Sequence, residues 1–308
     1  MENKKQHVVV ICGTTASGKT TLALQLAKEL TRANILSVDS RQAYRELDIV
    51  TGKDIPEDLP PEISFYGVNL FEPKETANIA DFVRYSKKII ADSYKNNLPL
   101  IIVGGSGLYL KAITQDLSDI SIPPNLKLRH KLEKLSLSSL QQELKKLNLK
   151  KYSSLNHSDV MNPRRLIRHI EISLTKNISN SKDEMSPNTI FHWIGLSQTK
   201  EELQKNIHAR VLGRLQQGAI VEVSNLLYRY PDHSLPIFSS LGVSQIKSYL
   251  EKKISLEELI SIWTNAELDY ARRQIVWFKK QSDIVWYDKN SDKIVLVADL
   301  KKIYTNNA

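Results

Sequence analysis

The feature that most constrains this chain is a phosphate-binding motif near its amino terminus. Residues 13–20 read Gly-Thr-Thr-Ala-Ser-Gly-Lys-Thr and match G-x-x-x-x-G-K-[S/T]. A β-branched segment at 7–12 precedes the motif, and apolar residues at helical spacing follow it over 20–30. A strand, a loop and a helix in this order form a P-loop, in which backbone N–H groups surround a phosphate at the start of the helix. The motif leaves open whether the phosphates belong to ATP, GTP or another diphosphate.

The residue types of the motif predict separate roles. Lys19 supplies a positive charge to terminal phosphate oxygens, and the hydroxyl of Thr20 is a ligand suited to Mg²⁺, the cofactor we expect. We therefore count Lys19 and Thr20 as candidate catalytic residues and Thr20 as the candidate metal ligand. The residues expected to bind the phosphates are Gly13, Thr14, Thr15, Ala16, Ser17, Gly18, Lys19 and Thr20.

The pattern of strand and helix recurs along the chain. Apolar runs at 35–38, 98–103 and 191–196 alternate with segments of helical spacing. Continuous apolar strands of this kind predict an α/β fold: a P-loop NTPase-like parallel sheet with helices on both faces. We expect residues 1–121 to begin this core and residues 188–308, mostly helical, to complete it. A long amphipathic helix is expected over 256–281.

Residues 122–187 differ from the core, because they are rich in Lys, Leu and Ser and contain no strand-like run. They predict a helical insertion domain. Between Lys127 and Lys176 there are twelve basic and four acidic residues, an excess of 12 − 4 = +8, against 43 − 34 = +9 for the whole chain. Charge concentrated in this way is typical of a surface that binds a nucleic-acid backbone. A solvated helical face is the alternative.

Composition limits the compartment and the kind of partner. The single cysteine, Cys12, excludes a cysteine-based zinc site and a disulfide framework within this chain. The polar start has no secretory apolar region, and no apolar run is long enough to cross a bilayer. We expect a cytoplasmic protein without a membrane partner, and a monomer.

Two further segments follow predicted strands at the edge where parallel sheets bind ligands. Asp39 lies at the end of the second strand and is a candidate to accept a proton or hydrogen bond from a nucleophile, or to hold Mg²⁺ through water. An Asp-Ser pair also suits a simple turn or cap. Gly104-Gly105-Ser106-Gly107 follows the third strand, where a tight turn and a substrate contact are both open readings. No Walker B strand follows, which argues against a motor ATPase.

Arginines cluster in two places. Arg164 and Arg168 share a helical face by i, i+4 spacing, which suits phosphate contacts. Arg272 and Arg273 are adjacent, so their side chains leave the helix in different directions and at most one readily reaches a shared cleft.

Five motifs together resemble the tRNA dimethylallyltransferase (isopentenyltransferase) family in order and spacing over nearly the whole chain. They are G-T-T-A-S-G-K-T at 13–20, S-V-D-S-R-Q-A-Y-R at 37–45, V-G-G-S-G-L-Y-L at 103–110, R-R-L-I-R-H-I-E at 164–171 and A-R-R-Q-I-V-W-F at 271–278. Segments 207–210 and 217–222 are weaker matches. The resemblance implies transfer of a dimethylallyl group from dimethylallyl diphosphate to N6 of the adenosine immediately 3′ of the anticodon, with the tRNA anticodon stem-loop as partner.

The resemblance also implies roles for single residues. The P-loop would hold the diphosphate with Mg²⁺, and Asp39 would orient or deprotonate the adenine amine. The residues implied to contact tRNA are Asp39, Ser40, Arg41, Gln42, Ser106, Arg129, Arg164, Arg165, Arg168, Arg272, Arg273 and Gln274.

Several positions depart from the family's usual pattern. Ser106 stands where a threonine is common, Asn162 where an aspartate is, and Val243 where a tyrosine is. The segment Val50 to Asp54 and the segment 65–67 also differ, which bears on substrate detail and efficiency more than on reaction class.

Three other functions share part of this evidence. A small-molecule kinase would use ATP at the same P-loop but would not need the basic insertion. An RNA-binding module without activity would leave Lys19, Thr20 and Asp39 without a role. Prenyl transfer to a free adenine nucleotide would keep the chemistry and change the acceptor.

Overall fold

The computed structural model describes residues 5–115, 120, 122–175, 189–291 and 293–306 of the 308. The chain divides into two units: Met1–Gln115 with Met185–Ala308 forms the core, and Asp116–Glu184 forms the insertion. The limits expected at residues 121 and 187 lie outside the described residues. Each unit is described by itself.

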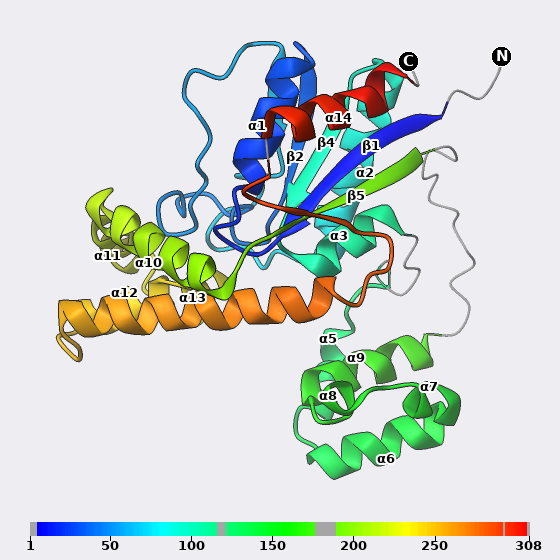
Figure 1. Cartoon of the computed structure of the whole chain (residues 1–308). Coiled ribbons are helices and arrows are strands. Elements are labelled where there is room, and N and C mark those ends of the chain that lie inside the picture. The colour runs from blue at the N-terminus through cyan, green and yellow to red at the C-terminus, as the bar shows by residue number, and fades with distance from the viewer. Residues whose placement is uncertain (1–4, 116–119, 121, 176–188, 292, 307–308) are drawn as a thin grey trace. The chain divides into compact units, whose positions relative to one another are not determined.

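A six-stranded parallel sheet lies at the centre of the core unit, in the order β3-β2-β4-β1-β5-β6 (Figure 1). The expected parallel sheet is confirmed. The strands are β1 (Gln6–Gly13), β2 (Ala33–Val38), β3 (Ile63–Tyr66), β4 (Leu100–Gly104), β5 (Thr189–Ser197) and β6 (Val285–Asp288). The four strands expected from apolar runs are β1, β2, β4 and β5, and the two edge strands were not anticipated.

Helices cover both faces of the sheet, because the buried strands are apolar on both sides. On one face, α1 (Lys19–Glu29) and α14 (Lys293–Thr305) pack side by side over alternate residues of the strands (Figure 1). On the other face, α2 (Ile79–Lys95) is tied to the sheet by two hydrogen bonds. The amide Nε2 of Gln6 donates to the carbonyl of Ile90 at 3.4 Å, and Nδ2 of Asn34 donates to Oγ of Ser93 at 2.9 Å.

The helices of the carboxy-terminal half form a second hydrophobic core around Trp263 and residues 44–50. They are α10 (Lys200–Gln216), α11 (Ala219–Arg229), the 3-10 turn η1 (Pro236–Ser239), α12 (Val243–Leu250) and α13 (Leu256–Phe278). Helix α13 begins at a capping box of Ser255 and Glu258 and ends three residues before the expected end at 281. Val50 and Val243, two of the departures from the family pattern, are buried in this core, and Val50 also lines the cavity described below.

The insertion consists of α5 (Leu126–Leu132), α6 (Leu137–Leu147), α7 (Leu149–Ser153), α8 (His157–Val160) and α9 (Pro163–Leu174). Each helix begins after an Asn or Ser whose side chain accepts a backbone N–H, a cap worth about 1 kcal/mol. Asn162 caps α9 in this way, accepting from Arg165 N at 3.2 Å, a role that the usual aspartate would also fill. Leu140, Leu144 and Leu166 lie in the small core of this unit.

No helix in the described part of the chain combines the length and the apolar content needed to cross a bilayer.

Candidate active site

The P-loop leaves β1 and turns directly into α1, where both of its outer glycines adopt positive φ. Gly13 has φ +142°, and a Cβ there would lie 2.8 Å from the carbonyl oxygen of Leu196 on the neighbouring strand. Only glycine permits this close approach. Gly18 has φ +85° and precedes the first turn of α1. The loop therefore presents the N-terminus of α1 at the carboxyl edge of the sheet.

A cavity of about 360 Å³ lies beside the P-loop at this edge, entirely within the core unit. It brings together nine of the residues predicted from sequence: Thr15, Lys19, Thr20, Asp39, Ser40, Arg41, Gln42, Arg273 and Gln274. Ser106 and Arg272 do not line it. The segments that meet here are far apart in sequence, so the fold assembles the site.

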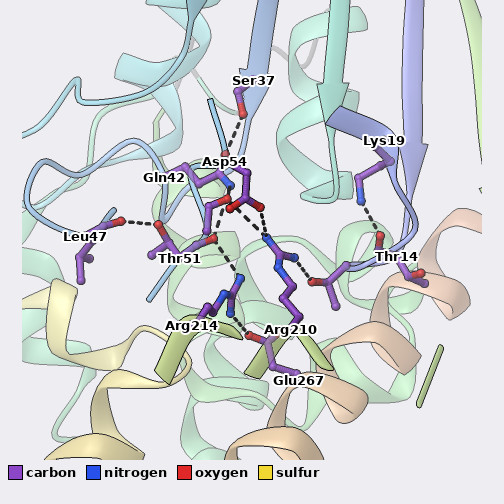
Figure 2. A network of polar contacts seen from close by, with 12 residues as sticks. Thr14, Lys19, Ser37, Gln42, Leu47, Thr51, Asp54, Arg210, Arg214 and Glu267 are labelled. Atoms are coloured by element: carbon purple, nitrogen blue, oxygen red, sulfur yellow. Dashed lines mark hydrogen bonds and ion pairs between the residues drawn. The ribbon is translucent and has the colours of Figure 1, made fainter. Parts of the chain in front are cut away.

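Lys19 points along the P-loop, where its Nζ donates a hydrogen bond to the carbonyl oxygen of Thr14 (Figure 2). Desolvation lowers the pKa of Lys19 to about 8, with a further contribution from the nearby charge of Arg210, while Asp39 acts in the opposite direction. The charge of Asp39 offsets desolvation only in part, so an anion bound at this loop would stabilise the charged form of Lys19.

Asp39 combines the two roles that the sequence left open. Its Oδ1 accepts the backbone N–H of Arg41 at 2.8 Å and that of Gln42 at 3.4 Å, which is a turn-capping pattern. Its Oδ2 has no protein partner among the described residues, and the side chain lines the cavity. One oxygen therefore fixes the turn and the other remains available to a substrate.

The two residues after the turn are held by the protein. Gln42 accepts from Ser37 Oγ at 3.0 Å and donates to the carbonyl of Gly52 at 2.8 Å (Figure 2). Arg41 donates to the carbonyl of Pro236 at 2.9 Å. Both line the cavity, and each is held in place by at least one hydrogen bond from its side chain to the protein.

Gln274 joins the P-loop to the Gly-Gly-Ser-Gly turn. Its Oε1 accepts from Thr15 N at 2.8 Å, and its Nε2 donates to Gly105 O at 2.9 Å. Tyr270, one turn earlier on α13, also lines the cavity, and burial raises its pKa, with the nearby charge of Asp39 adding to the effect.

The two adjacent arginines of α13 point apart, as expected. Arg273 lines the cavity, with its guanidinium 5.8 Å from the ring centre of Tyr270. Arg272 pairs with Asp269 at 2.6 Å, and both side chains are exposed. A contact of Arg272 with tRNA stays a prediction.

Several residues of the cavity were missed from sequence, and three of them, Arg210, Arg214 and Glu267, carry charge. Arg210 Nη1 donates to Thr15 Oγ1 at 2.9 Å and so reaches the P-loop from α10 (Figure 2). Arg214, one turn further on, pairs with Glu267 of α13 at 2.8 Å, and both side chains are buried. Burial lowers the pKa of Arg214 to about 10, with Arg210 adding to the effect and Glu267 opposing it. The signals available in the sequence were the i, i+4 spacing of the arginines and the weaker family match at 207–210, which ends in Arg210.

The described residues contain no group of three or more His, Cys, Asp or Glu side chains placed to hold a metal ion. Thr20, the candidate metal ligand, lines the cavity.

Comparison with known proteins identifies the family. The family model described as IPP transferase matches residues 42–281. A tRNA dimethylallyltransferase of Synechocystis sp. is 36% identical over 283 residues, which cover 91% of this chain and 90% of the relative. The chain belongs to the IPP transferase family. A tRNA dimethylallyltransferase of Halothermothrix orenii is 33% identical, covering 97% of this chain and 90% of the relative.

Solved structures agree with this assignment. The full-length tRNA isopentenylpyrophosphate transferase of Bacillus halodurans matches with a TM-score of 0.70 at 28% identity, covering 98% of this chain and 97% of that one. A eukaryotic dimethylallyltransferase solved with tRNA as its substrate matches the fold with a TM-score of 0.81 at 23% identity, covering 98% and 80%. The IPP transferase fold therefore extends over the whole chain, insertion included.

The insertion of this IPP transferase uses several of its predicted arginines internally. Arg129 binds Glu171 with two hydrogen bonds of 2.8 Å, and Arg168 adds a third at 3.4 Å. Arg165 pairs with Asp159 at 2.6 Å. Arg164 is exposed and has no protein partner among the described residues.

Proposed function

We propose that this chain is a tRNA dimethylallyltransferase, which transfers a dimethylallyl group from dimethylallyl diphosphate to N6 of the adenosine immediately 3′ of the anticodon. The observation that carries the proposal is the cavity beside the P-loop. Lys19 and Arg210, which would face the diphosphate, line this cavity together with Asp39, whose Oδ2 is available to a substrate. The names of the relatives, tRNA dimethylallyltransferase, support the acceptor and the group transferred.

The geometry suits a displacement reaction. The N6 nitrogen forms a bond to C1 of the prenyl group while the bond from C1 to the diphosphate oxygen breaks. Oδ2 of Asp39 accepts the proton that N6 releases. The P-loop amides, Lys19 and Arg210 stabilise the negative charge that develops on the diphosphate.

The adenosine must leave the stack of the anticodon loop to reach a cavity of this size. Ser40, Arg41 and Gln42 would contact the flipped nucleotide. Internal hydrogen bonds already hold the side chains of Arg41 and Gln42. Preorganisation of this kind avoids ordering the wall at the moment of binding.

Thr20 would hold Mg²⁺ together with diphosphate oxygens, since the described residues offer no acidic cluster for it. When bound, the cation would neutralise charge on the leaving diphosphate.

The insertion would bind the phosphates of the anticodon stem. Arg164 and the lysines between residues 127 and 151 supply the charge, because Arg129, Arg165 and Arg168 are engaged with carboxylates.

A prenylation assay tests the proposal. Unmodified tRNA with adenosine 3′ of the anticodon is incubated with dimethylallyl diphosphate and Mg²⁺, and nucleoside masses are measured. We expect one added prenyl group on adenosine, lost in Lys19→Ala while tRNA affinity remains. ATP and free AMP are offered in parallel reactions. Phosphoryl transfer from ATP, or prenylation of AMP with none on tRNA, would contradict the proposal.

A further inference from the structure

A glutamate of α11 holds a loop that contributes to the cavity. Oε1 of Glu222 accepts the backbone N–H groups of Asp48 at 2.7 Å and Ile49 at 2.8 Å. Its Oε2 accepts the backbone N–H group of Val50 at 2.8 Å. Hydrogen bonds to an ionised acceptor are stronger than those between neutral groups, so this carboxylate fixes three successive residues of the loop. Glu222 does not line the cavity itself, and the proposed reaction gives it no role.

The loop that Glu222 fixes offers backbone carbonyls to three side chains of the cavity. Nε2 of Gln42 donates to Gly52 O at 2.8 Å and to Thr51 O at 3.4 Å (Figure 2). Arg214 donates to Thr51 O at 3.2 Å, and Arg210 donates to Gly52 O at 3.4 Å. The hydrogen bond from Gln42 to Gly52 is the shortest of the four, so Gln42 depends most on the position of this loop.

Residues 48–53 are closed on themselves, so a shift at one end reaches the other. Gly52 N donates to Ile49 O at 3.0 Å, and Lys53 N donates to Asp48 O at 2.9 Å. Gly52 has φ +64°, and a Cβ there would lie 2.4 Å from Nη2 of Arg210. Because the backbone fits this closely against a cavity side chain, movement of residues 48–50 would displace the carbonyls that follow.

The three side chains differ in what else holds them. Arg210 also donates to Thr15 Oγ1 of the P-loop at 2.9 Å, and Arg214 also pairs with Glu267 at 2.8 Å. Both of these bonds are shorter than the bonds that the arginines make to the loop. The Nε2 of Gln42, in contrast, makes its shortest hydrogen bond to the loop itself. A displaced loop would therefore disturb Gln42 more than the two arginines.

We infer that Glu222 is a positioning residue for the acceptor nucleotide, which acts through residues 48–52 and the side-chain amide of Gln42. The inference rests on the proposed function, in which Gln42 contacts the flipped adenosine. A fixed amide binds a nucleotide without being ordered at that moment, so its release weakens tRNA binding. The diphosphate, held by the P-loop, Lys19 and Arg210, would be affected much less.

The test substitutes Glu222→Gln, which keeps the size of the side chain. A glutamine has one oxygen, and its amide NH₂ would face a backbone N–H donor in place of an acceptor. The quantities measured are KM for tRNA and KM for dimethylallyl diphosphate, in the wild type, in Glu222→Gln, in Gln42→Leu and in the double variant. Thermal unfolding of each protein identifies an assay temperature at which all are folded.

The matched control is Glu258→Gln. Oε2 of Glu258 accepts the backbone N–H group of Ser255 at 2.7 Å at the start of α13, and Glu258 does not line the cavity. The control therefore makes the same chemical change to a carboxylate that holds backbone elsewhere in the core unit.

We expect Glu222→Gln to raise KM for tRNA about tenfold, to leave KM for the donor within about twofold, and Glu258→Gln to change neither. In the Gln42→Leu background, Glu222→Gln should add less than about a twofold change, because two substitutions that act through one contact are not additive. Additive effects, or equal rises in both KM values, overturn the inference. So does a loss of stability with both KM values unchanged, which would make the role of Glu222 purely structural.

Glu222→Asp covers the case in which Glu222→Gln is unfolded. Aspartate keeps the charge on a shorter side chain, so KM for tRNA should rise by a smaller factor with KM for the donor unchanged. An unchanged KM for tRNA in this variant would then overturn the inference. Absence of prenyl transfer in the wild type would contradict the proposed function itself, because that result does not depend on Glu222.

Discussion

Each unit contains a buried glutamate that pairs with an arginine at 2.8 Å. The two pairs differ in how many of their polar atoms have hydrogen-bond partners. Glu171 in the insertion accepts from Arg129, Arg168 and the backbone N–H of Asn125. Glu267 at the cavity accepts from Arg214 at 2.8 Å, and the Nε of that arginine has no partner. The first pair is saturated with hydrogen bonds, whereas the second leaves one buried donor of its arginine unpaired beside the cavity.

The same distinction applies to charge read from the sequence. The +8 excess of the segment 127–176 already subtracts Asp159 and Glu171, the acidic partners of Arg129, Arg165 and Arg168. These pairs therefore change which side chains carry the excess charge rather than its size. Buried charges must be compensated, so part of a basic segment serves its own core.

Two lysines give the sharpest test of this comparison. Lys53 is buried, and its Nζ donates to Tyr44 O, Asp48 Oδ1 and Asn69 Oδ1 at 2.5–2.6 Å, whereas Lys19 is satisfied only by its own loop. Lys19→Met should lower kcat/KM for prenyl transfer about 10³-fold with little loss of stability. Lys53→Met should lower the free energy of unfolding by roughly 3 kcal/mol. Steady-state kinetics and denaturant unfolding of both variants measure the two effects, and a large stability loss in Lys19→Met would break the comparison.

Glu171→Gln should destabilise the insertion by roughly 3 kcal/mol, because it leaves two arginines beside a neutral amide. Hydrogen exchange of α5 and α9 in the whole chain measures this. Although burial opposes ionisation, hydrogen bonds from Arg129, Asn125 N and Arg168 hold the pKa of Glu171 below its ordinary value. The ionised carboxylate of Glu171 therefore stabilises the fold at pH values above the ordinary carboxyl pKa. This stabilisation is lost as the pH falls through the lowered pKa. If hydrogen exchange of α5 and α9 is unchanged in Glu171→Gln, the ion pairs of Glu171 do not stabilise the insertion.

The pH dependence of donor binding should report Lys19. Because desolvation lowers its pKa to about 8, the charged form that a diphosphate requires is lost as the pH rises through that value. We expect kcat/KM for the donor to fall about tenfold per pH unit above pH 8. Lys19→Arg, which stays charged, should remove this limb even if its activity is lower. If kcat/KM for the donor still falls above pH 8 in Lys19→Arg, a group other than Lys19 is responsible for the decrease.

Two arginines on α9 test the insertion with the smallest expected effect. Arg164→Gln should lower tRNA affinity a few-fold and reduce the salt dependence of binding by about one phosphate contact, without changing stability. Arg168→Gln should instead lower stability, because Arg168 binds Glu171 and the carbonyl of Ile122. Filter binding across a salt series and thermal unfolding distinguish them. The reverse pattern would mean that Arg168 is the residue that contacts tRNA.

Much of the fold could be predicted from local pattern. The buried central strands are continuous apolar runs, so β1, β2, β4 and β5 were all found. The edge strands β3 and β6 span only four residues each and carry Ser, Tyr, Trp and Asp. Such segments become strands through pairing with a neighbour, which no local pattern reveals.

Site residues that belong to a local sequence motif could be predicted. Site residues that the packing of distant helices brings to the cavity could not. The P-loop and Asp39 follow strands directly, so their shared edge could be inferred. Arg210, Arg214 and Glu267 lie on helices, and the face that a helix turns toward the sheet depends on packing across α10 and α13. The internal pairing of Arg129 and Arg168 was hidden for the same reason.

The most direct test of the account is single-turnover prenylation by Asp39→Asn. Asparagine keeps an oxygen that accepts the N–H groups of Arg41 and Gln42, so the turn should persist, but it cannot take a proton from N6. The account predicts a rate of bond formation at least about 10²-fold lower, with tRNA and donor affinities unchanged. A rate within a few-fold of the wild type would contradict it, because Asp39 would then act only as the cap of its turn.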